Sequence, residues 1–316
     1  MPDGSPVPRA EVAADALEGL LSRPKTLPPK LFYDAEGCRL FSLITGLPEY
    51  YLTRTELLLL DRAGPAIGAT VAEHAAVVEY GAGSETKATI LLAALRQPAA
   101  YVPIDIAEPE LKEGAARLAR AFPGLTIHPT AADFSAPFRL PAAVAHLPRL
   151  GFFPGSTIGN FDPATAIRFL AQARQTLGDG AQFLLGADLR KDPALLIPAY
   201  DDAQGITAAF NRNILARLNR EAAADFKLQA FAHRIVWNDA ESRIEMHLVS
   251  RVRQTVHVAG RAIHFAEGES IHTENSYKYT PERLLDLARQ AGWQRVQLWT
   301  DPDDLFSIQL LKAESA

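Results

Sequence analysis

The chain has 316 residues, of which 48% are hydrophobic and 22% are charged, and its formal net charge at pH 7 is −5. This is the composition of a globular protein with one large or two modest domains, and the lack of a Lys/Arg run argues against nucleic-acid binding. No apolar stretch reaches the roughly 20 residues of a membrane span, and the single cysteine, Cys38, excludes an intrachain disulfide framework and fits a reducing cytoplasm.

The N-terminal region is expected to be partly helical. Apolar residues follow helical spacing from Ala10 to Leu21, and a second helical stretch ends near Ile44. The connector Leu47–Glu56 gathers aromatic and charged side chains around Pro48, a composition typical of a binding surface.

Strands and helices are predicted to alternate between Ala75 and Leu189. Most of the strands are continuous apolar runs, which is typical of strands covered on both faces. The pattern therefore predicts a parallel, doubly wound α/β sheet. The expected strands are Ala76–Tyr80, Tyr101–Ile106, Leu125–Pro129, Leu150–Pro154 and Gln182–Gly186, and the expected helices are Thr86–Leu95, Pro109–Ala121 and Pro163–Leu177.

The turn between the first of these strands and its helix reads Gly81-Ala82-Gly83. Glycines let the backbone approach a ligand closely, and the order strand, tight turn, helix is typical of nucleotide-binding folds. A dinucleotide fingerprint needs a third glycine where Thr86 stands, and an acidic residue, Glu79, precedes the turn. These features favour S-adenosylmethionine over a nicotinamide cofactor.

Four further residues are candidates for contacts with a cofactor that contains adenosine. Asp105 ends the second strand, where a carboxylate can accept hydrogen bonds from both ribose hydroxyls. Asp133 and Phe134 follow the third strand, where a carboxylate can receive the adenine amino group and a ring can stack on the base. Lys87, at a helix N-terminus, can pair with the carboxylate of a methionine moiety. Each also has a plainer interpretation, as a helix cap, a loop residue or a solvated lysine.

The segment Phe153–Phe161, which ends the fourth strand, contains two glycines, two hydroxyl residues and Asn160. Ligands bind at the carboxyl ends of parallel strands in such folds, so we expect a polar, close-approach surface here. Ser156 and Thr157 can equally be only turn and cap residues. The Asn/Asp-Pro-Pro-aromatic motif of many methyltransferases that act on nucleobase amines is missing.

After residue 190 the alternation breaks off, and we expect an inserted, largely antiparallel lobe. A helical region, Ala203–Glu221, precedes a hairpin and two short strands. Met246 alternates with apolar neighbours in the hairpin, which favours a core position. If the segment around residue 275 is a strand, Glu274 and Ser276 share one face and can grip a single polar ring. The expected strands before it are Phe231–Trp237, Arg243–Val252, Thr255–Val258 and Ala262–Phe265.

The end of the chain is predicted to return to the sheet. A helix, Pro281–Gln290, begins after a Thr280 cap, and the strands Trp293–Trp299 and Leu305–Leu311 follow. This closing arrangement resembles that of class I methyltransferases, whose last strand is inserted antiparallel. We therefore expect a methyltransferase domain made of residues 55–190 and 277–316 and a substrate-binding lobe made of residues 1–54 and 191–276. The eight histidines show no ligand spacing such as H-x-x-x-H, so no bound metal is expected.

Several blocks, in order along the chain, carry a more specific resemblance. The chain resembles the L-histidine Nα-methyltransferases of ergothioneine biosynthesis from about Leu27 to Leu311. The blocks are Phe32-Tyr33-Asp34, Leu47–Tyr51 with Thr53–Glu56, Gly155–Asn160, Ala199–Asp202, Thr207–Asn213, Arg243–Met246 and Thr273-Glu274.

The resemblance implies a role for each candidate residue. The cofactor contacts fall on Gly81, Lys87, Asp105, Asp133 and Phe134, and the amino-acid pocket places Tyr50, Asn160 and Tyr200 around the substrate carboxylate. Tyr33 lies near the amine and, with Tyr50, is the implied catalytic residue, while Glu274 and Ser276 hold the imidazole nitrogens and Met246 packs beside the ring. Two positions depart from the family pattern: Ala82 stands where relatives tend to have serine, and Asn275 stands where relatives have an apolar residue.

The implied reaction is transfer of three methyl groups from S-adenosylmethionine to the α-amino group of histidine, giving hercynine. The same chemistry on another amino acid or small amine is the nearest alternative. A nicotinamide-dependent oxidoreductase and a non-catalytic sensor with a methyltransferase fold are alternatives of other classes. We expect a cytoplasmic monomer with no nucleic-acid or membrane partner.

Overall fold

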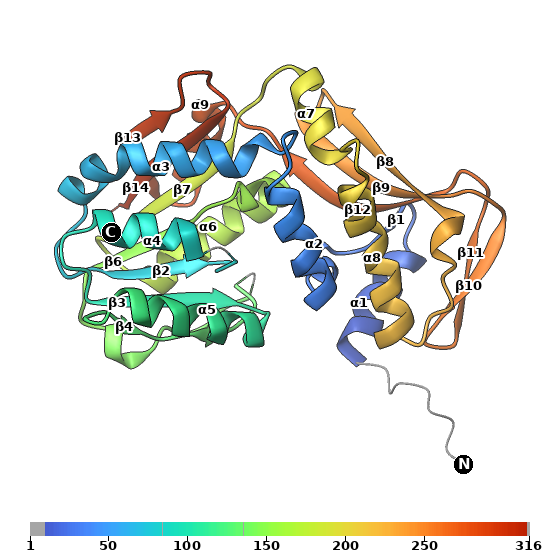
Figure 1. The fold of residues 1–316 in the computed structure, drawn as a ribbon, viewed down its shortest axis with the longest axis horizontal. Helices are drawn as coiled ribbons and strands as arrows, with labels where there is room; N and C mark the ends of the chain where they lie inside the picture. The colour runs from blue at the N-terminus through green and yellow to red at the C-terminus, as the bar shows by residue number, and fades with distance from the viewer. Residues whose placement is uncertain (1–9, 84, 135, 315–316) are drawn as a thin grey trace, which may run out of the picture. The chain divides into compact units, whose positions relative to one another are not determined.

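The structure is a computed structural model that describes residues 10–83, 85–134 and 136–314. The chain divides into two compact units, each made of two stretches of sequence (Figure 1). The α/β unit comprises Leu52–Arg190 and Tyr277–Ala316, and the lobe comprises Met1–Tyr51 and Lys191–Ser276.

The α/β unit is built on an eight-stranded sheet. From one edge to the other its strands are β13 (Trp293–Thr300), β14 (Phe306–Ala313), β7 (Gln182–Asp188), β6 (Arg149–Phe153), β2 (Ala76–Tyr80), β3 (Ala100–Asp105) and β4 (Thr126–Ile127), and β5 (Thr130–Ala131) also pairs with β3. Neighbours from β7 to β4 are parallel, whereas β14 runs antiparallel to both β7 and β13, between which it is inserted. The predicted doubly wound sheet with an inserted antiparallel last strand is confirmed.

Helices cover both faces of this sheet, as the apolar strands predict. One face packs against α3 (Tyr51–Thr70), α4 (Glu85–Ala94) and α5 (Glu108–Ala121), and the other packs against α6 (Pro163–Leu177) and α9 (Pro281–Gln290). Successive residues of a strand point to opposite faces, so Val77 and Val78 of β2 belong to different hydrophobic cores and both are fully buried.

Capping residues set the start of α6 and α9. The Asp162 carboxylate accepts a hydrogen bond from the Thr165 N–H, and the Thr280 hydroxyl accepts one from the Arg283 N–H. A proline occupies the first position of each helix, where its missing N–H costs nothing. The predicted bounds of both helices are confirmed.

The lobe combines helices with two antiparallel pairs of strands. Its four-stranded sheet has the order β1-β12-β9-β8, and β10 pairs with β11 as a separate ribbon. The prediction of a hairpin followed by two short strands is confirmed. The lobe elements are α1 (Ala10–Leu21), β1 (Lys25–Thr26), η1 (Pro29–Phe32), α2 (Ala35–Thr45), α7 (Pro193–Tyr200), α8 (Ile206–Glu221), η4 (Leu228–Ala230), β8 (Phe231–Asn238), β9 (Arg243–Ser250), β10 (Gln254–Val258), β11 (Arg261–Phe265) and β12 (Ser270–Tyr277).

Two local predictions are wrong, and one helix lies where no element is predicted. The segment Leu47–Glu56 is a connector only as far as Tyr50, because α3 begins at the next residue and continues through Pro65, which lies on the exposed side of the helix. Helix α7 lies where the sequence analysis names no element, and it continues through Pro198. The third strand is reduced to the two-residue strands β4 and β5, because Pro129 between them has no N–H for a ladder.

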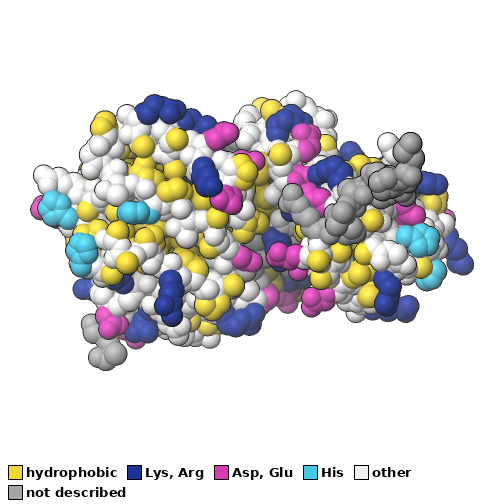
Figure 2. All heavy atoms as spheres, turned by 90° about the horizontal axis from the view of Figure 1, so that it is seen from below, with side chains coloured by type: hydrophobic (Ala, Val, Ile, Leu, Met, Phe, Trp, Pro, Cys, Tyr) yellow, Lys and Arg dark blue, Asp and Glu magenta, His cyan; other side chains and the backbone are white. Residues whose placement is uncertain are grey.

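Among the described residues, no helix is long and apolar enough to cross a bilayer. Figure 2 shows Lys and Arg side chains interspersed with Asp and Glu side chains on one face of the molecule, in keeping with the mixed charge of the sequence.

Candidate active site

The glycine turn after β2 is held against the neighbouring strand. The backbone N–H groups of Gly81 and Ala82 both donate to the Ile104 carbonyl oxygen, at 2.9 and 3.0 Å. Gly81 has a φ of +75°, and a Cβ there would lie 3.4 Å from the Phe134 ring. A side chain at this position would therefore strain the backbone and crowd the ring.

Asp105, at the end of β3, is largely withdrawn from solvent. Its carboxylate accepts a hydrogen bond from the Ala107 N–H at 2.8 Å, and burial raises the pKa of the group. Of the other candidates, Asp133 is exposed, while Phe134 packs edge-to-face against Phe153 with ring centroids 5.7 Å apart. The structure thus brings together Gly81, which follows β2, and Phe134, which follows β5, two strands that both pair with β3.

Lys87 is not a solvated lysine. Its ammonium lies 2.6 Å from a Glu56 carboxylate oxygen, and the two side chains are only 9% and 2% exposed. Glu56 also accepts two hydrogen bonds from the Gly155 N–H, at 2.8 and 3.0 Å. This carboxylate therefore ties α3 to α4 and to the loop after β6, a role that nothing in the sequence indicates beyond the place of Glu56 in a family block.

Glu79, directly before Tyr80 and the glycine turn, is fully buried. The Tyr101 hydroxyl donates to one of its oxygens at 2.5 Å. Burial raises the pKa of Glu79 to about 8, although the Tyr101 hydrogen bond and the charge of Lys87 act in the opposite direction. Glu79 is therefore mostly protonated at neutral pH, which leaves Lys87 and Glu56 as a balanced pair.

The loop after β6 leads to Asn160 through η3 (Thr157–Asn160). The Ser156 hydroxyl accepts a hydrogen bond from the Asp188 N–H at 2.9 Å, which ties the loop to the end of β7. A Cβ at Gly159 would lie 2.8 Å from the Tyr277 carbonyl oxygen, so only glycine fits this approach. Ser156 is thus more than a surface turn residue.

In the lobe, the structure brings together three residues predicted to bind an amino acid. The Tyr200 hydroxyl lies 2.8 Å from the Ser276 hydroxyl, and the rings of Tyr50 and Tyr200 pack edge-to-face at 6.3 Å. All three side chains are buried. The Tyr33 ring lies in the same unit, 6.0 Å from that of Phe210.

The strand that carries Glu274 shows a shift in its exposure pattern. Burial alternates along β12 up to Thr273, but Glu274 directly after it is also buried, and Asn275 is half-buried. Glu274 and Ser276 therefore both lie on buried positions of the confirmed strand β12. On β9, Met246 is 2% exposed, as its apolar alternation predicts, and the Thr273 hydroxyl donates to its carbonyl oxygen at 3.0 Å.

Asn211 and Asn213 of α8 are polar residues that sequence reasoning missed as site supports. Asn211 is fully buried, and its side chain donates to the His247 carbonyl oxygen and accepts from the Thr273 hydroxyl. Asn213 donates to the Asp34 carboxylate at 2.7 Å, next to Tyr33. A buried asparagine at an apolar-face position of a helix was the available signal, because such a group must find partners.

The inserted antiparallel strand, the glycine turn after β2 and the acidic residue that ends β3 define a class I, S-adenosylmethionine-dependent methyltransferase. Comparison with known families makes the assignment more specific. A family model for histidine-specific, S-adenosylmethionine-dependent methyltransferases matches residues 12–313, so the chain belongs to that family.

Named relatives agree with this assignment. The chain is 43% identical over 313 residues to a histidine N-alpha-methyltransferase of Mycolicibacterium smegmatis, covering 95% of this chain and 96% of that protein. It is 41% identical over 305 residues to the protein of the same name from Mycobacterium tuberculosis, covering 94% and 93%. It is also 29% identical over 292 residues to ergothioneine biosynthesis protein 1 of Neurospora crassa, covering 88% of this chain and 32% of that protein.

Proposed function

We propose that this enzyme methylates the α-amino group of L-histidine with S-adenosylmethionine, and that three transfers give hercynine in ergothioneine biosynthesis. The observation that carries the proposal is the family match over residues 12–313, together with 43% identity to a relative named histidine N-alpha-methyltransferase. The proposal is also supported by the hydrogen bond between the Tyr200 and Ser276 hydroxyls in the lobe, because both residues are predicted to bind the amino acid.

In this proposal the α/β unit binds the cofactor and the lobe supplies most of the amino-acid contacts. Gly81, Lys87, Asp105, Asp133 and Phe134 all belong to the α/β unit. The predicted amino-acid contacts belong to the lobe, apart from Asn160: they are Tyr33, Tyr50, Tyr200, Met246, Glu274 and Ser276. We further propose that the enzyme works as a monomer and that it works in the cytoplasm; the single cysteine supports the second of these proposals.

The residues of the α/β unit fit S-adenosylmethionine. A Cβ built on Gly83 would meet no atom within 4 Å, so the turn has open space beside it. The Asp105 carboxylate, whose pKa burial raises, gains from hydroxyl donors that replace lost water, and two ribose hydroxyls would be such donors. When bound, S-adenosylmethionine supplies a methyl group carried by an electrophilic sulfonium.

Lys87 is well placed to select the methionine carboxylate. It lies in the first turn of α4, where the helix dipole also favours an anion. Because Glu56 neutralises Lys87 in the buried pair, the site does not hold an uncompensated charge before the cofactor arrives.

The lobe residues bind the substrate without stabilising its ammonium form strongly. Tyr50 and Tyr200 offer neutral hydroxyl donors to the substrate carboxylate, and Asn160 offers an amide. The attacking amine must be neutral, so these neutral contacts avoid placing a negative charge beside the nitrogen. Tyr33 accepts a hydrogen bond from the amine or passes its proton outward through water. Holding the nucleophile on the line of attack then contributes much of the acceleration.

Glu274 and Ser276 provide selectivity for the imidazole ring. A carboxylate that accepts a hydrogen bond from an imidazole N–H forms a charge-assisted bond, which a phenyl ring cannot form because it has no N–H. Ser276, already joined to Tyr200, contacts the other ring nitrogen, and Met246 packs beside the ring.

The test is mass spectrometry of the purified enzyme incubated with S-adenosylmethionine and an equimolar mixture of the twenty amino acids. We expect a product that corresponds to histidine plus three methyl groups, and its absence when histidine is omitted. Methylation of a different amino acid would reject histidine as the substrate and direct attention to Asn275, whose Oδ1 is buried without a hydrogen-bond partner among the described residues. No methylated product would reject the proposed reaction.

A further inference from the structure

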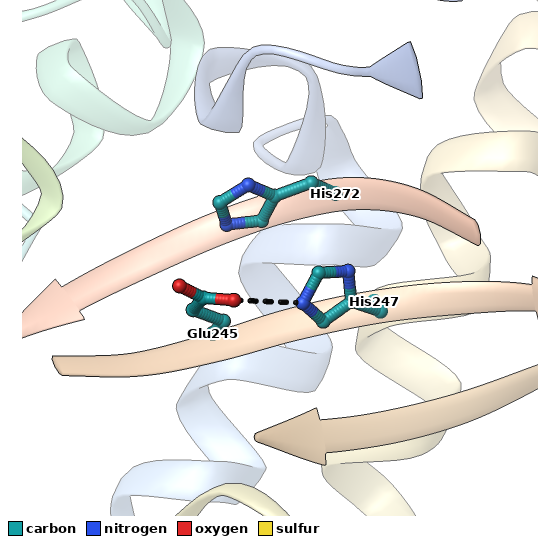
Figure 3. Close-up of side chains that lie close together, drawn as sticks. All are labelled: Glu245, His247 and His272. Carbon is teal, nitrogen blue, oxygen red and sulfur yellow. Dashed lines mark hydrogen bonds and ion pairs between the residues drawn. The ribbon is translucent and has the colours of Figure 1, made fainter. Parts of the chain in front are cut away.

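The lobe sheet carries a cluster of three metal-ligating side chains that the proposed reaction does not use. Glu245 and His247 lie two residues apart on β9, and His272 lies on the neighbouring strand β12 (Figure 3). Each residue offers one ligand atom, and these atoms lie within 4.8 Å of one another. The two imidazole rings are stacked with centroids 4.8 Å apart.

The cluster lies on the opposite side of β9 from Met246. Residues two apart on a strand share a face, and the exposure of β9 alternates, with Glu245 and His247 half-buried and Met246 buried between them. The side chains of Glu245 and His247 are 13% and 14% exposed. This leaves an approach for a solvated ion while limiting competition from bulk water.

The donor atoms already have the spacing that a small ion needs. His247 Nε2 lies 3.2 Å from Glu245 Oε2. Zinc with bonds of about 2.0–2.1 Å to nitrogen and oxygen separates two tetrahedral ligands by about 3.3 Å, which is close to this distance. An ion between Glu245 Oε2 and His247 Nε2 would therefore be bound by both atoms. A rotation of the His272 side chain would then bring in the third ligand.

The polar environment leaves unused binding capacity at these groups. Asn238 and Arg243 donate to Oε1 of Glu245, so among the described residues Oε2 has only the 3.2 Å contact with His247 Nε2. His247 Nδ1 is buried without a hydrogen-bond partner among the described residues. His272 Nε2 lies 3.0 Å from the Glu274 carbonyl oxygen, and a rotation of the His272 side chain toward an ion would exchange this contact for a bond to the metal.

We propose that Glu245, His247 and His272 form a binding site for a divalent transition-metal ion, with zinc as the type case and water at the remaining position. Two imidazoles and one carboxylate suit zinc, nickel or copper, whereas magnesium and calcium prefer oxygen ligands alone. The linear spacing of histidines predicted no metal because the donors come from two strands that only the fold brings together.

Charge sets the strength of this site. Arg243 lies 2.7 Å from Glu245 Oε1 and opposes a cation at the carboxylate. The substitution Arg243→Gln removes that positive charge and keeps a donor, so it should raise zinc affinity. A rise in zinc affinity in Arg243→Gln would therefore distinguish a site that includes Glu245 from adventitious binding to surface histidines.

The experiment is calorimetric titration of the chelator-treated enzyme with zinc, with Co²⁺ absorption spectra as a readout of coordination. We expect one ion per chain, and affinity about 10- to 100-fold weaker or worse for His247→Ala, His272→Ala and Glu245→Gln. The control is His264→Ala, which removes a histidine from strand β11 of the ribbon; within the described part of the chain the His264 side chain bonds only to Thr255. Absence of saturable binding, or unchanged affinity in His272→Ala, would overturn the proposal.

A measurement on the unaltered enzyme keeps the test valid if a variant folds poorly. Histidine side-chain NMR with zinc should shift the signals of His247 and His272 first among the eight histidines. Shifts confined to His257 and His264 of the β10–β11 ribbon would contradict the site. Zinc should also raise the thermal midpoint of the unaltered enzyme more than that of Glu245→Gln, because an ion that binds only the folded state stabilises it.

Discussion

Glu274 is the single charged side chain among the lobe residues predicted to hold the substrate ring, and it is 9% exposed. Replacing it with alanine should lower kcat/KM for histidine by about 10- to 100-fold, the range that a charge-assisted hydrogen bond of about 1.5–3 kcal/mol gives. Amino acids with a phenyl ring lose no such bond, so the ratio of kcat/KM for histidine to kcat/KM for such an amino acid should fall. Competition assays read by mass spectrometry measure this ratio.

The matched control for this prediction is Glu241→Ala, which removes a carboxylate from the exposed turn between β8 and β9. It should leave both the rate and the preference as they are. A Glu274→Ala enzyme that still prefers histidine by the original factor would refute the role given to this carboxylate.

Glu56 offers a second test, because it holds Lys87 in a buried ion pair at 2.6 Å. Glu56→Gln keeps an acceptor for the Gly155 N–H but leaves Lys87 without an anion, which should lower the free energy of unfolding by about 3 kcal/mol. The methionine carboxylate would then be the main anion for Lys87. The thermal midpoint should therefore rise more on adding S-adenosylmethionine than it does in the unaltered enzyme.

Differential scanning fluorimetry with and without the cofactor measures this difference. The control is Glu73→Gln, which breaks a surface pair with Arg96 in which both side chains are about half exposed and should change little. An equal cofactor-induced shift in Glu56→Gln and in the unaltered enzyme would argue against contact between Lys87 and the methionine carboxylate.

At the scale of elements, the sequence predicts those features that local chemistry specifies. Helices α6 and α9 were placed to the residue because each begins with a capping side chain and a proline. Helices α3 and α7 are not among the predicted elements, and each continues through an internal proline, a residue that disfavours a helix interior. Tertiary packing against the sheet stabilises α3 despite the lost hydrogen bond, and no local signal reports that packing.

The same distinction applies to the candidate site. Asp105 and Gly81 follow strands whose ends meet in any parallel sheet, so their neighbourhood could be predicted from the order of elements. The Glu56–Lys87 pair and the Glu245, His247 and His272 cluster join residues distant in sequence or on different strands, so only the folded chain reveals them.

Asn211 tests how α8 supports the substrate-binding strands. Its amide contacts His233 of β8, the His247 carbonyl of β9 and the Thr273 hydroxyl of β12. Asn211→Ala should cost about 3 kcal/mol of stability, because several buried partners lose their hydrogen bonds. It should raise KM for histidine while leaving the affinity for S-adenosylmethionine unchanged, since the α/β unit is not altered.

Steady-state kinetics and cofactor titration separate these effects. Asn219→Ala is the control on the same helix, because the Asn219 side chain bonds, among the residues that the structure describes, only to the Phe226 backbone. A loss of cofactor affinity equal to the loss of histidine affinity would show that Asn211 supports the whole molecule and not the lobe strands.

For the molecule as a whole, the buried Glu79 makes stability depend on pH. Burial raises its pKa from the ordinary 4.5 to about 8, so between these values the folded state holds a proton that the unfolded chain has released. The stability from this group is fully present below about pH 4.5 and is lost as the pH rises through about 8. The loss amounts to on the order of 5 kcal/mol.

Glu79→Gln isolates this contribution, because an amide cannot titrate yet keeps an oxygen that accepts from the Tyr101 hydroxyl. Urea unfolding of both proteins at about pH 5 and about pH 9 should show a smaller loss of stability in the variant, since other titrating groups are common to both. Equal losses in the two proteins would mean that Glu79 is ionised in the folded state. In that case Lys87 would face two buried carboxylates, Glu56 and Glu79, and would attract the methionine carboxylate far less than the neutral form of Glu79 allows.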